Sequence, residues 1–239
     1  MPGNLEDWTV LPHDPPRQVT DDILTVVGEI GMPLMTLPRR MTVVRLKDGR
    51  LAIFSAIALD EAEMRRLEAF GAPAFLIVPN DHHRMDAKIW KDRYPELTVI
   101  APPGSREAVE AAVPVDSTEG DFGDPSVRLV IVPGTGEREA ALEVRRPGGL
   151  TLVINDVIGN IRDARGFGGW LLKRMGFAGD EPHLPAPVRL AMVEDKAALR
   201  RQFLAWANDP ALRLILVSHG QPIEGDPQGA LKALAETLE

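Results

Sequence analysis

Residues 9–58 contain apolar runs of the length typical of β-strands. These runs are Ile23–Ile30, Met41–Leu46 and Leu51–Ser55. Between the last two lies Lys47–Arg50, which contains Asp48-Gly49. This dipeptide favours a tight hairpin, because glycine readily adopts the positive φ that such turns require. The pattern therefore predicts that the chain begins with antiparallel β-structure.

After Ser55 the apolar positions recur with the period of a helix. Met64, Leu67 and Phe70 fall on one face of a helix over residues 60–70, and Gly71 is a candidate C-cap. A buried strand over residues 72–78, a helix through residue 91 and a strand over residues 97–101 follow by the same reasoning. This part of the chain is predicted to alternate between strand and helix.

The second half repeats the order of strands first and helices afterwards. The predicted strands are residues 127–132, 141–144, 150–154 and 214–218, and the predicted helices are residues 167–175, 196–208 and 228–238. Pro182–Pro187 is interpreted as a rigid connector, because strand and helix patterns resume beyond it. Two such halves closing on one core would place two sheets face to face with helices outside, in one domain over residues 1–239.

Composition narrows the range of partners. Of the 239 residues, 44% are apolar and 26% are charged, which is typical of a folded globular protein. The net charge is −8, and no basic stripe offsets it, so nucleic acid is not expected as a partner. The first residues lack the pattern of a signal peptide, and no window approaches 18 uninterrupted apolar residues. We therefore predict a cytoplasmic protein with a small-molecule ligand or substrate and no membrane partner.

The absence of cysteine limits the chemistry further. It excludes disulfide scaffolds, thiolate zinc sites, Fe–S clusters and cysteine nucleophiles. A metal ion in this protein must therefore be held by histidine and carboxylate side chains.

Candidate ligands of that kind follow three of the predicted strands. His82 and Asp86 come after the strand that ends at residue 78, Asp156 follows residues 150–154, and His219 follows residues 214–218. Taken singly, a polar residue at a strand end is usually a solvated cap or turn former. Because ligands bind where such strand ends meet, the four residues together predict a metal or hydrolytic site.

The order of these motifs resembles that of the metallo-β-lactamase superfamily. The resemblance rests on hairpins followed by His-x-x-x-Asp after a buried strand, an apolar strand ending in Asp, and a later strand ending in Ser-His-Gly. Within the superfamily, residues 41–59, the Val78-Pro-Asn loop with its paired histidines, Arg93-Tyr-Pro-Glu and Ala101-Pro-Pro-Gly look like the DUF4336 family. The similarity covers residues 8–219. It implies a four-layer αββα sandwich with any active site at one edge between the sheets.

The resemblance also implies a set of metal ligands. In the superfamily motif His-x-His-x-Asp-His, His82 matches the first His and Asp86 matches the Asp. Arg84 and Ala87 stand where the other two histidines are expected, and Thr135 stands where the third metal motif carries its His.

The remaining two motifs are intact. Asp156 matches the bridging Asp of the superfamily, and His219 matches its terminal His. The resemblance thus implies a reduced site at His82, Asp86, Asp156 and His219 and makes a binuclear zinc centre doubtful.

Two hypotheses for this site keep a metal ion. In one, a single divalent ion (Zn, Mn or Fe) binds at Asp86, Asp156 and His219, with His82 or His83 as a further ligand. The ion would activate water for hydrolysis of an ester, a thioester or a phosphodiester. In the other, the loop register shifts so that His83 replaces the missing second histidine and restores a fuller site.

A further hypothesis needs no metal. Arg84 would fill the vacated pocket and pair with Asp86 or Asp156, keeping the carboxylates ionised. The protein would then be a catalytically silent scaffold that binds a small molecule or a protein partner. The sequence leaves the three hypotheses open.

Overall fold

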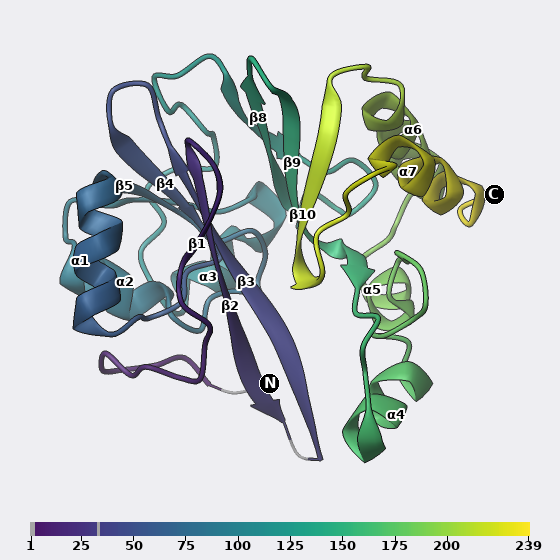
Figure 1. The fold of residues 1–239 in the computed structure, drawn as a ribbon, viewed down its shortest axis with the longest axis horizontal. Helices are drawn as coiled ribbons and strands as arrows, with labels where there is room; N and C mark the ends of the chain where they lie inside the picture. Colours follow the sequence, from purple (N-terminus) through teal and green to yellow (C-terminus); the bar gives the residue numbers. More distant parts are fainter. Residues whose placement is uncertain (1–2, 33) are drawn as a thin grey trace.

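Two β-sheets form the centre of the molecule (Figure 1), in a computed structural model that describes residues 3–32 and 34–239. The first sheet has the strand order β1-β2-β3-β4-β5-β6, and the second has the order β10-β9-β8-β7. The strands are β1 (Arg17–Thr20), β2 (Ile23–Met32), β3 (Met35–Arg45), β4 (Arg50–Phe54), β5 (Ala72–Ile77), β6 (Thr98–Ile100), β7 (Val127–Ile131), β8 (Ala140–Arg146), β9 (Gly149–Asn160) and β10 (Leu212–Gly220).

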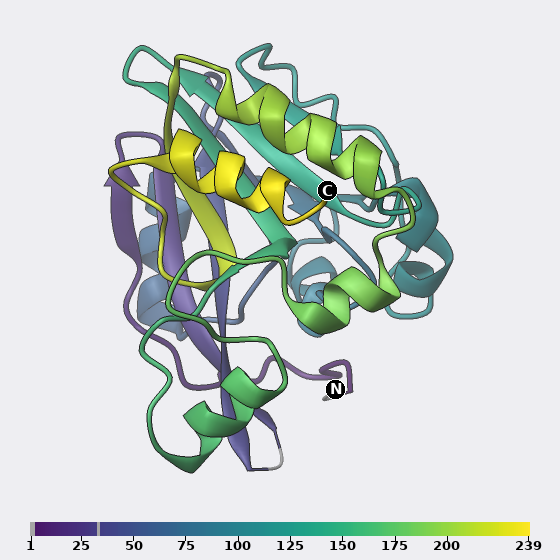
Figure 2. The same ribbon diagram turned by 90° about the vertical axis from the view of Figure 1, so that its right-hand side faces the viewer.

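Helices cover the outer face of each sheet. Those on the first sheet are α1 (Glu61–Phe70), α2 (Ala87–Arg93) and α3 (Arg106–Glu110), with a 3₁₀ turn at Pro103–Ser105, and those on the second are α6 (Lys196–Ala207) and α7 (Pro227–Glu236). α4 (Gly166–Arg174) contacts β3, and α5 (Ala186–Ala191) contacts β9. Figure 2 shows α6 and α7 side by side over the second sheet. Over the residues that the structure describes, no helix has the length and hydropathy needed to cross a membrane.

Three apolar clusters define the layers. The first packs α1, α2 and α3 against the first sheet and includes Met64 and Trp90, and the second packs α6 and α7 against the second sheet and includes Phe203. The third lies between the sheets, where Phe54 of β4 and Leu142 of β8 are fully buried. Each sheet therefore buries both faces, and the predicted four-layer αββα sandwich is confirmed.

The strongest local signals of the sequence act as predicted. Asp48-Gly49 turns the chain between β3 and β4, and Gly49 has a φ of 87°, which glycine tolerates without a steric penalty. Asp60 begins α1 by accepting hydrogen bonds from the backbone N–H groups of Ala62 and Glu63, each at 2.9 Å.

Several elements differ from the predictions: β1 and α3 were not predicted, and β3, α5 and β9 have other bounds or structure than expected. β3 begins at Met35, six residues before the predicted apolar run, because the hairpin with β2 continues as far as the pairing of Met32 with Met35. The segment predicted as a rigid connector contains the start of α5, which has a proline in its first turn, where a missing N–H costs nothing. β9 continues to Asn160 instead of ending before Asp156.

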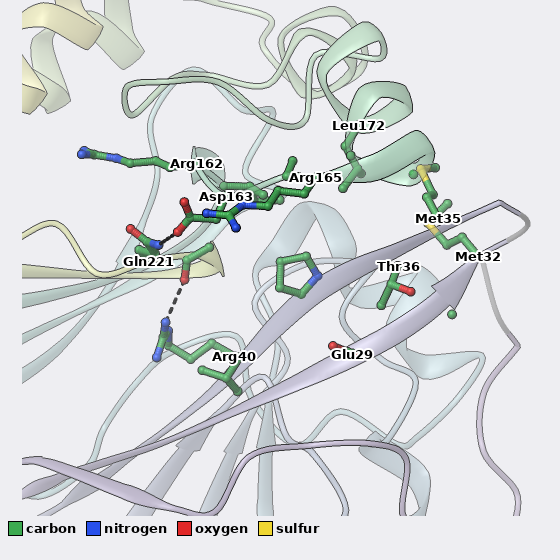
Figure 3. Close-up of a pocket in the computed structure, with 18 of the residues that line it drawn as sticks. Glu29, Met32, Met35, Thr36, Arg40, Arg162, Asp163, Arg165, Leu172 and Gln221 are labelled. Carbon is green, nitrogen blue, oxygen red and sulfur yellow. Dashed lines mark hydrogen bonds between the residues drawn. The ribbon is translucent and has the colours of Figure 1, made fainter.

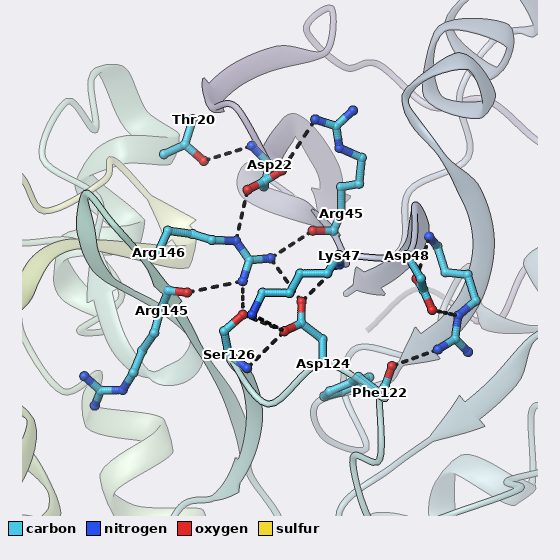
Figure 4. A network of polar contacts seen from close by, with 11 residues as sticks. Thr20, Asp22, Arg45, Lys47, Asp48, Phe122, Asp124, Ser126, Arg145 and Arg146 are labelled. Carbon is cyan, nitrogen blue, oxygen red and sulfur yellow. Dashed lines mark hydrogen bonds and ion pairs between the residues drawn. The ribbon is translucent and has the colours of Figure 1, made fainter.

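A polar network joins the two sheets at the end of the molecule opposite α4 and α5 (Figure 4). Arg146 of β8 donates from Nε to Asp22 at 3.0 Å and from Nη2 to the carbonyl of Arg45 at 3.0 Å. It also bonds Ser126 and reaches Asp124 at 3.4 Å. Because the partners come from the turns of both sheets, this arginine helps to fix the sheets relative to each other.

Candidate functional site

Three side chains from distant parts of the chain meet at one edge between the sheets. They are His83 from the loop after β5, Asp156 from β9 and His219 from β10. Asp156 Oδ1 lies 3.1 Å from His83 Nε2 and 3.0 Å from His219 Nε2, and the two nitrogens are 3.2 Å apart. Among the described residues, these three form a group whose ligand atoms all lie within 4.8 Å of one another.

A bulge in β9 carries Asp156 to this position. Between the paired residues Val217–Ile154 and His219–Gly159, β10 advances two residues while β9 advances five. The extra residues leave the regular ladder, as residues in a β-bulge do, and bring the Asp156 side chain to His219. The apolar run predicted a strand end at residue 154, before Asn155 and Asp156. Instead, Asp156 is buried and its oxygens are hydrogen-bonded, so the strand continues.

The Nδ1 atoms of His83 and His219, which face away from Asp156, contact other groups. His219 Nδ1 lies 2.6 Å from the carbonyl oxygen of Pro38, and His83 Nδ1 lies 2.7 Å from Ser55 Oγ. A carbonyl oxygen can only accept, so His219 carries its proton on Nδ1 and its neutral form presents the Nε2 lone pair to the cluster. This is the arrangement found around histidine metal ligands, in which a second partner fixes the tautomer.

Ser55 was not predicted as part of the site. It directly follows β4, is buried, and has a φ of 56°, in the left-handed region that residues with a side chain seldom adopt. Such conformations concentrate at functional sites. The available sequence signal was the position of Ser55 at the end of the apolar run Leu51–Ser55. Asp156 and His219 were selected by a similar signal, because each follows an apolar run.

The charges within the cluster stabilise one another. Burial alone would raise the pKa of Asp156, but the adjacent His83 and His219 outweigh it and hold that pKa well below its usual range. Burial opposes protonation of His219, yet the hydrogen bond and charge of Asp156 raise its pKa. For His83, burial dominates over the attraction of Asp156 and lowers the pKa. The cluster therefore contains an ionised carboxylate next to a histidine that stays neutral.

A second carboxyl group lies behind Asp156. Asn80 donates to Asp156 Oδ2 at 2.7 Å and to Glu139 Oε2 at 2.9 Å. Burial and the charge of Asp156 raise the pKa of Glu139 well above its usual range. Asp156 is thus the carboxylate that carries the negative charge in this part of the site.

His82 lies next to the cluster without joining it. Its side chain is 52% exposed, and Nδ1 lies 2.7 Å from Asp81. The hydrogen bond that His82 donates to the Asp81 carboxylate raises the pKa of His82 against the effect of partial burial. Of the two adjacent histidines, the structure therefore brings His83 to Asp156 and His219, as the hypothesis of a shifted loop register expected.

The hypothesis that Arg84 replaces a metal is corrected by the structure. Arg84 donates to the backbone carbonyl of Ala108, in α3, and does not pair with either carboxylate. Thr135 also lies apart from the cluster, where its hydroxyl donates to the carbonyl of Val132 at 2.8 Å.

Asp86 has a different arginine as its partner. Arg39 of β3 pairs with Asp86 through both terminal nitrogens, and the two side chains are 6% and 1% exposed. The backbone N–H of Ala58 also donates to Asp86, at 3.0 Å. The expected guanidinium is therefore present but comes from β3 and not from the loop that contains Arg84. Two consecutive arginines inside the apolar β3 sequence were the available signal for it.

A cavity of about 300 Å³ opens beside the cluster. His83, Asp156, His219, Ser55 and Arg39 form part of its lining. The remainder is built mainly from apolar side chains of the β2–β3 hairpin, α4 and α5, so a ligand at the cluster would contact an apolar wall.

A larger cleft of about 950 Å³ lies on the other side of the hairpin (Figure 3). It shares Met32, Met35 and Leu172 with the smaller cavity. Its other side chains include Arg40, which donates to the carbonyls of Val217 and Gly220 at 3.0 and 2.8 Å and thereby connects β3 to β10.

Comparison with known proteins identifies the fold. No family model matches the chain, and no curated sequence matches it significantly, so the DUF4336 resemblance stays a prediction. Solved structures do match over nearly their whole length. The mono-zinc form of the metallo-β-lactamase FIM-1 from Pseudomonas aeruginosa is 12% identical with a TM-score of 0.64, and the alignment covers 95% of this chain and 96% of that one.

Two further structures agree with this match. The DIM-1 metallo-β-lactamase exposed to ceftazidime is 12% identical with a TM-score of 0.65, covering 97% of this chain and 100% of that one. A metallo-β-lactamase from Erythrobacter litoralis with β-mercaptoethanol in its active site is 15% identical with a TM-score of 0.63, covering 93% and 96%. The two packed sheets, their covering helices and these neighbours together show that this chain has the metallo-β-lactamase fold.

Proposed function

We propose that the protein is a metal-dependent hydrolase with a mononuclear site formed by His83, Asp156 and His219. The observation that carries the proposal is the triangle formed by the two Nε2 atoms and Asp156 Oδ1, with sides of 3.0 to 3.2 Å. Ligand bonds of roughly 2.0–2.1 Å in a tetrahedral site place neighbouring ligand atoms about 3.3–3.4 Å apart. The triangle therefore fits one divalent ion with only small adjustments.

The chemistry of the three groups supports the same conclusion. With the His219 proton on Nδ1, its Nε2 lone pair faces both a carboxylate oxygen and the second imidazole. The repulsion between these groups is relieved by a proton on His219 Nε2, which Asp156 favours, or by a bound cation. A set of two histidines and one carboxylate, with room for an open position, is typical of catalytic zinc sites and also suits manganese or iron.

Arg39 supports a single ion. In the superfamily pattern Asp86 would belong to the second metal site, but here its carboxylate is neutralised by a buried guanidinium. A second cation at Asp86 would have to displace that guanidinium. The FIM-1 neighbour was solved in a mono-zinc form, so the same fold accommodates one zinc ion in that protein.

When bound, the metal ion supplies Lewis-acid polarisation of a substrate oxygen and lowers the pKa of water to about 7. The chain itself orients the ligand atoms: Pro38 fixes the imidazole of His219, and Ser55 fixes that of His83. Asn80 holds Asp156 through the oxygen that faces away from the histidines. We assign the reaction to the hydrolysis of an acyl or phosphoryl ester.

The adjacent histidines allow a matched test. Protein freed of metal with a chelator should bind one Zn²⁺ per chain in calorimetry. At a free concentration one hundred times Kd, binding stabilises the fold by about 2.7 kcal/mol. For a chain of this size, that raises Tm by roughly 5–11 °C. His83→Ala should lose the rise in Tm, whereas His82→Ala should keep it, because His82 is paired with Asp81.

The outcome of this comparison decides the assignment. Equal losses in the two variants would show that the ligand set is wrong. Folded wild-type protein that binds neither Zn²⁺ nor Mn²⁺ would overturn the metal-dependent hydrolase.

A second candidate function has one observation in its favour. Ser55 Oγ lies 2.7 Å from His83 Nδ1, and His83 Nε2 lies 3.1 Å from Asp156. This chain of contacts matches the order of groups in a serine hydrolase, in which histidine activates the serine hydroxyl. Esterase activity that survives chelation and disappears in Ser55→Ala would establish this alternative. Activity that needs added metal and persists in Ser55→Ala supports the metal site.

A further inference from the structure

The cavity beside the cluster has two chemically different kinds of lining. The histidines and carboxylates described above form part of it. Most of the remaining lining is apolar and comes from the β2–β3 hairpin, from α4 and the segment that follows it, and from α5 and its flanks, with Met35, Phe177 and Val188 as examples; Arg138 also lines the cavity. A molecule filling the cavity would therefore have a polar group at the cluster and an apolar extension.

The charged residues of the cavity are already paired. Arg39 binds Asp86, and Asp81 lies against His82. Arg138 donates to Glu194 at 3.0 Å and to the carbonyls of Ala191 and Met192 at 3.0 and 3.3 Å. Neither arginine is available to hold a phosphate without losing these bonds. The lining thus disfavours a phosphodiester and favours a substrate whose only polar part is at the reacting bond.

The volume of the cavity and the flexibility of its lining side chains limit the length and shape of the substrate's apolar part. At roughly 30 Å³ for a group the size of a water molecule, a cavity of about 300 Å³ holds about ten such groups. Five of the lining residues are methionines, whose unbranched side chains adapt to a flexible ligand. An unbranched acyl chain satisfies both conditions.

We infer that the substrate is an ester or thioester of a medium-chain acyl group, with its carbonyl at His83, Asp156 and His219 and its chain in the apolar cavity. This inference rests on the proposed hydrolase function. It adds a substrate class that the cluster alone does not specify, because the cluster would serve any acyl or phosphoryl ester.

The first experiment varies chain length in the metal-loaded protein. Hydrolysis of p-nitrophenyl acetate, butyrate, hexanoate and octanoate is measured as kcat/KM. Each methylene that enters the cavity should raise kcat/KM by up to about fourfold. The rise should level off once the cavity is full.

Two tryptophan substitutions on α5 provide a matched pair. Val188 lines the cavity, whereas Leu190, two residues further on, is 90% exposed. Val188→Trp should remove the rise in kcat/KM with chain length, because the indole would occupy space into which the longer acyl chains extend. Leu190→Trp should behave as wild type throughout.

A binding measurement separates this inference from the hydrolase proposal. Calorimetry on chelator-treated protein compares 1-hexanol with 1-octanol, neither of which can be hydrolysed. Octanol should bind about fifteenfold more tightly, in wild type and Leu190→Trp but not in Val188→Trp.

Each outcome has a defined meaning. Hydrolysis of all esters at one rate, with equal binding of the two alcohols, would overturn the acyl substrate and leave the hydrolase standing. Graded alcohol binding without hydrolysis of any ester in metal-loaded protein would overturn the hydrolase, and with it the substrate assignment.

Discussion

Replacing Arg39 with methionine tests the buried ion pair that distinguishes this site. Methionine keeps most of the apolar stem and removes the charge, so Asp86 would be left as a buried carboxylate with the backbone N–H of Ala58 as its remaining donor. Both side chains of the pair are more than nine-tenths buried. Breaking a pair in such surroundings costs about 3–5 kcal/mol, because the remaining charge is uncompensated. For a chain of this size the corresponding loss in Tm is roughly 6–20 °C.

The assay is urea unfolding followed by circular dichroism, with the free energy of unfolding compared among four proteins. Arg106→Met is the matched control, because Arg106 pairs with Glu110 where the side chains are 46% and 42% exposed. Exposed pairs of this kind contribute at most about 1 kcal/mol. The double variant Arg39→Met/Asp86→Asn removes both charges and should be more stable than Arg39→Met. A loss for Arg39→Met no larger than that for Arg106→Met would refute the reasoning.

Two further predictions concern parts of the fold away from the site. Tyr94 is the only tyrosine of the chain, and partial burial together with its hydrogen bond to Glu68 raises its pKa to about 12. Absorbance at 295 nm should therefore show ionisation near pH 12 in folded protein and near pH 10 in guanidinium. Because the pKa is higher in the folded state, the stability that Tyr94 contributes is lost as pH rises from about 10 to about 12. A midpoint near pH 10 in folded protein would contradict the burial of Tyr94 and its hydrogen bond to Glu68. Gly49→Ala should cost about 1–2 kcal/mol, because its φ of 87° is unfavourable for alanine although nothing lies within 4 Å. Gly148→Ala, with equal space and no positive φ, should be close to neutral in the same unfolding assay.

Local patterns in the sequence were sufficient to predict most elements of the fold. The period of apolar residues predicted α1, α6 and α7, and the Asp48-Gly49 signal predicted the turn between β3 and β4, because these structures depend on neighbours only a few residues away. The packing of two sheets followed from the resemblance to the metallo-β-lactamase superfamily. The ends of apolar runs selected Asp156 and His219, the resemblance matched both to metal motifs, and the structure brings them together.

The sequence by itself thus determined the layers, the polar residues at the ends of apolar runs, and the restriction of metal ligands to histidine and carboxylate. It left open which of His82 and His83 would turn inward, since two adjacent histidines in one loop have the same local pattern. Only the tertiary structure decided this, because Ser55 and Asp156 lie far from His83 in the sequence and reach it only when β4 and the β9 bulge are in place. The partner of Asp86 was decided in the same way. Arg84 is two residues away, but Arg39 on a neighbouring strand is held against the carboxylate by the buried packing around both.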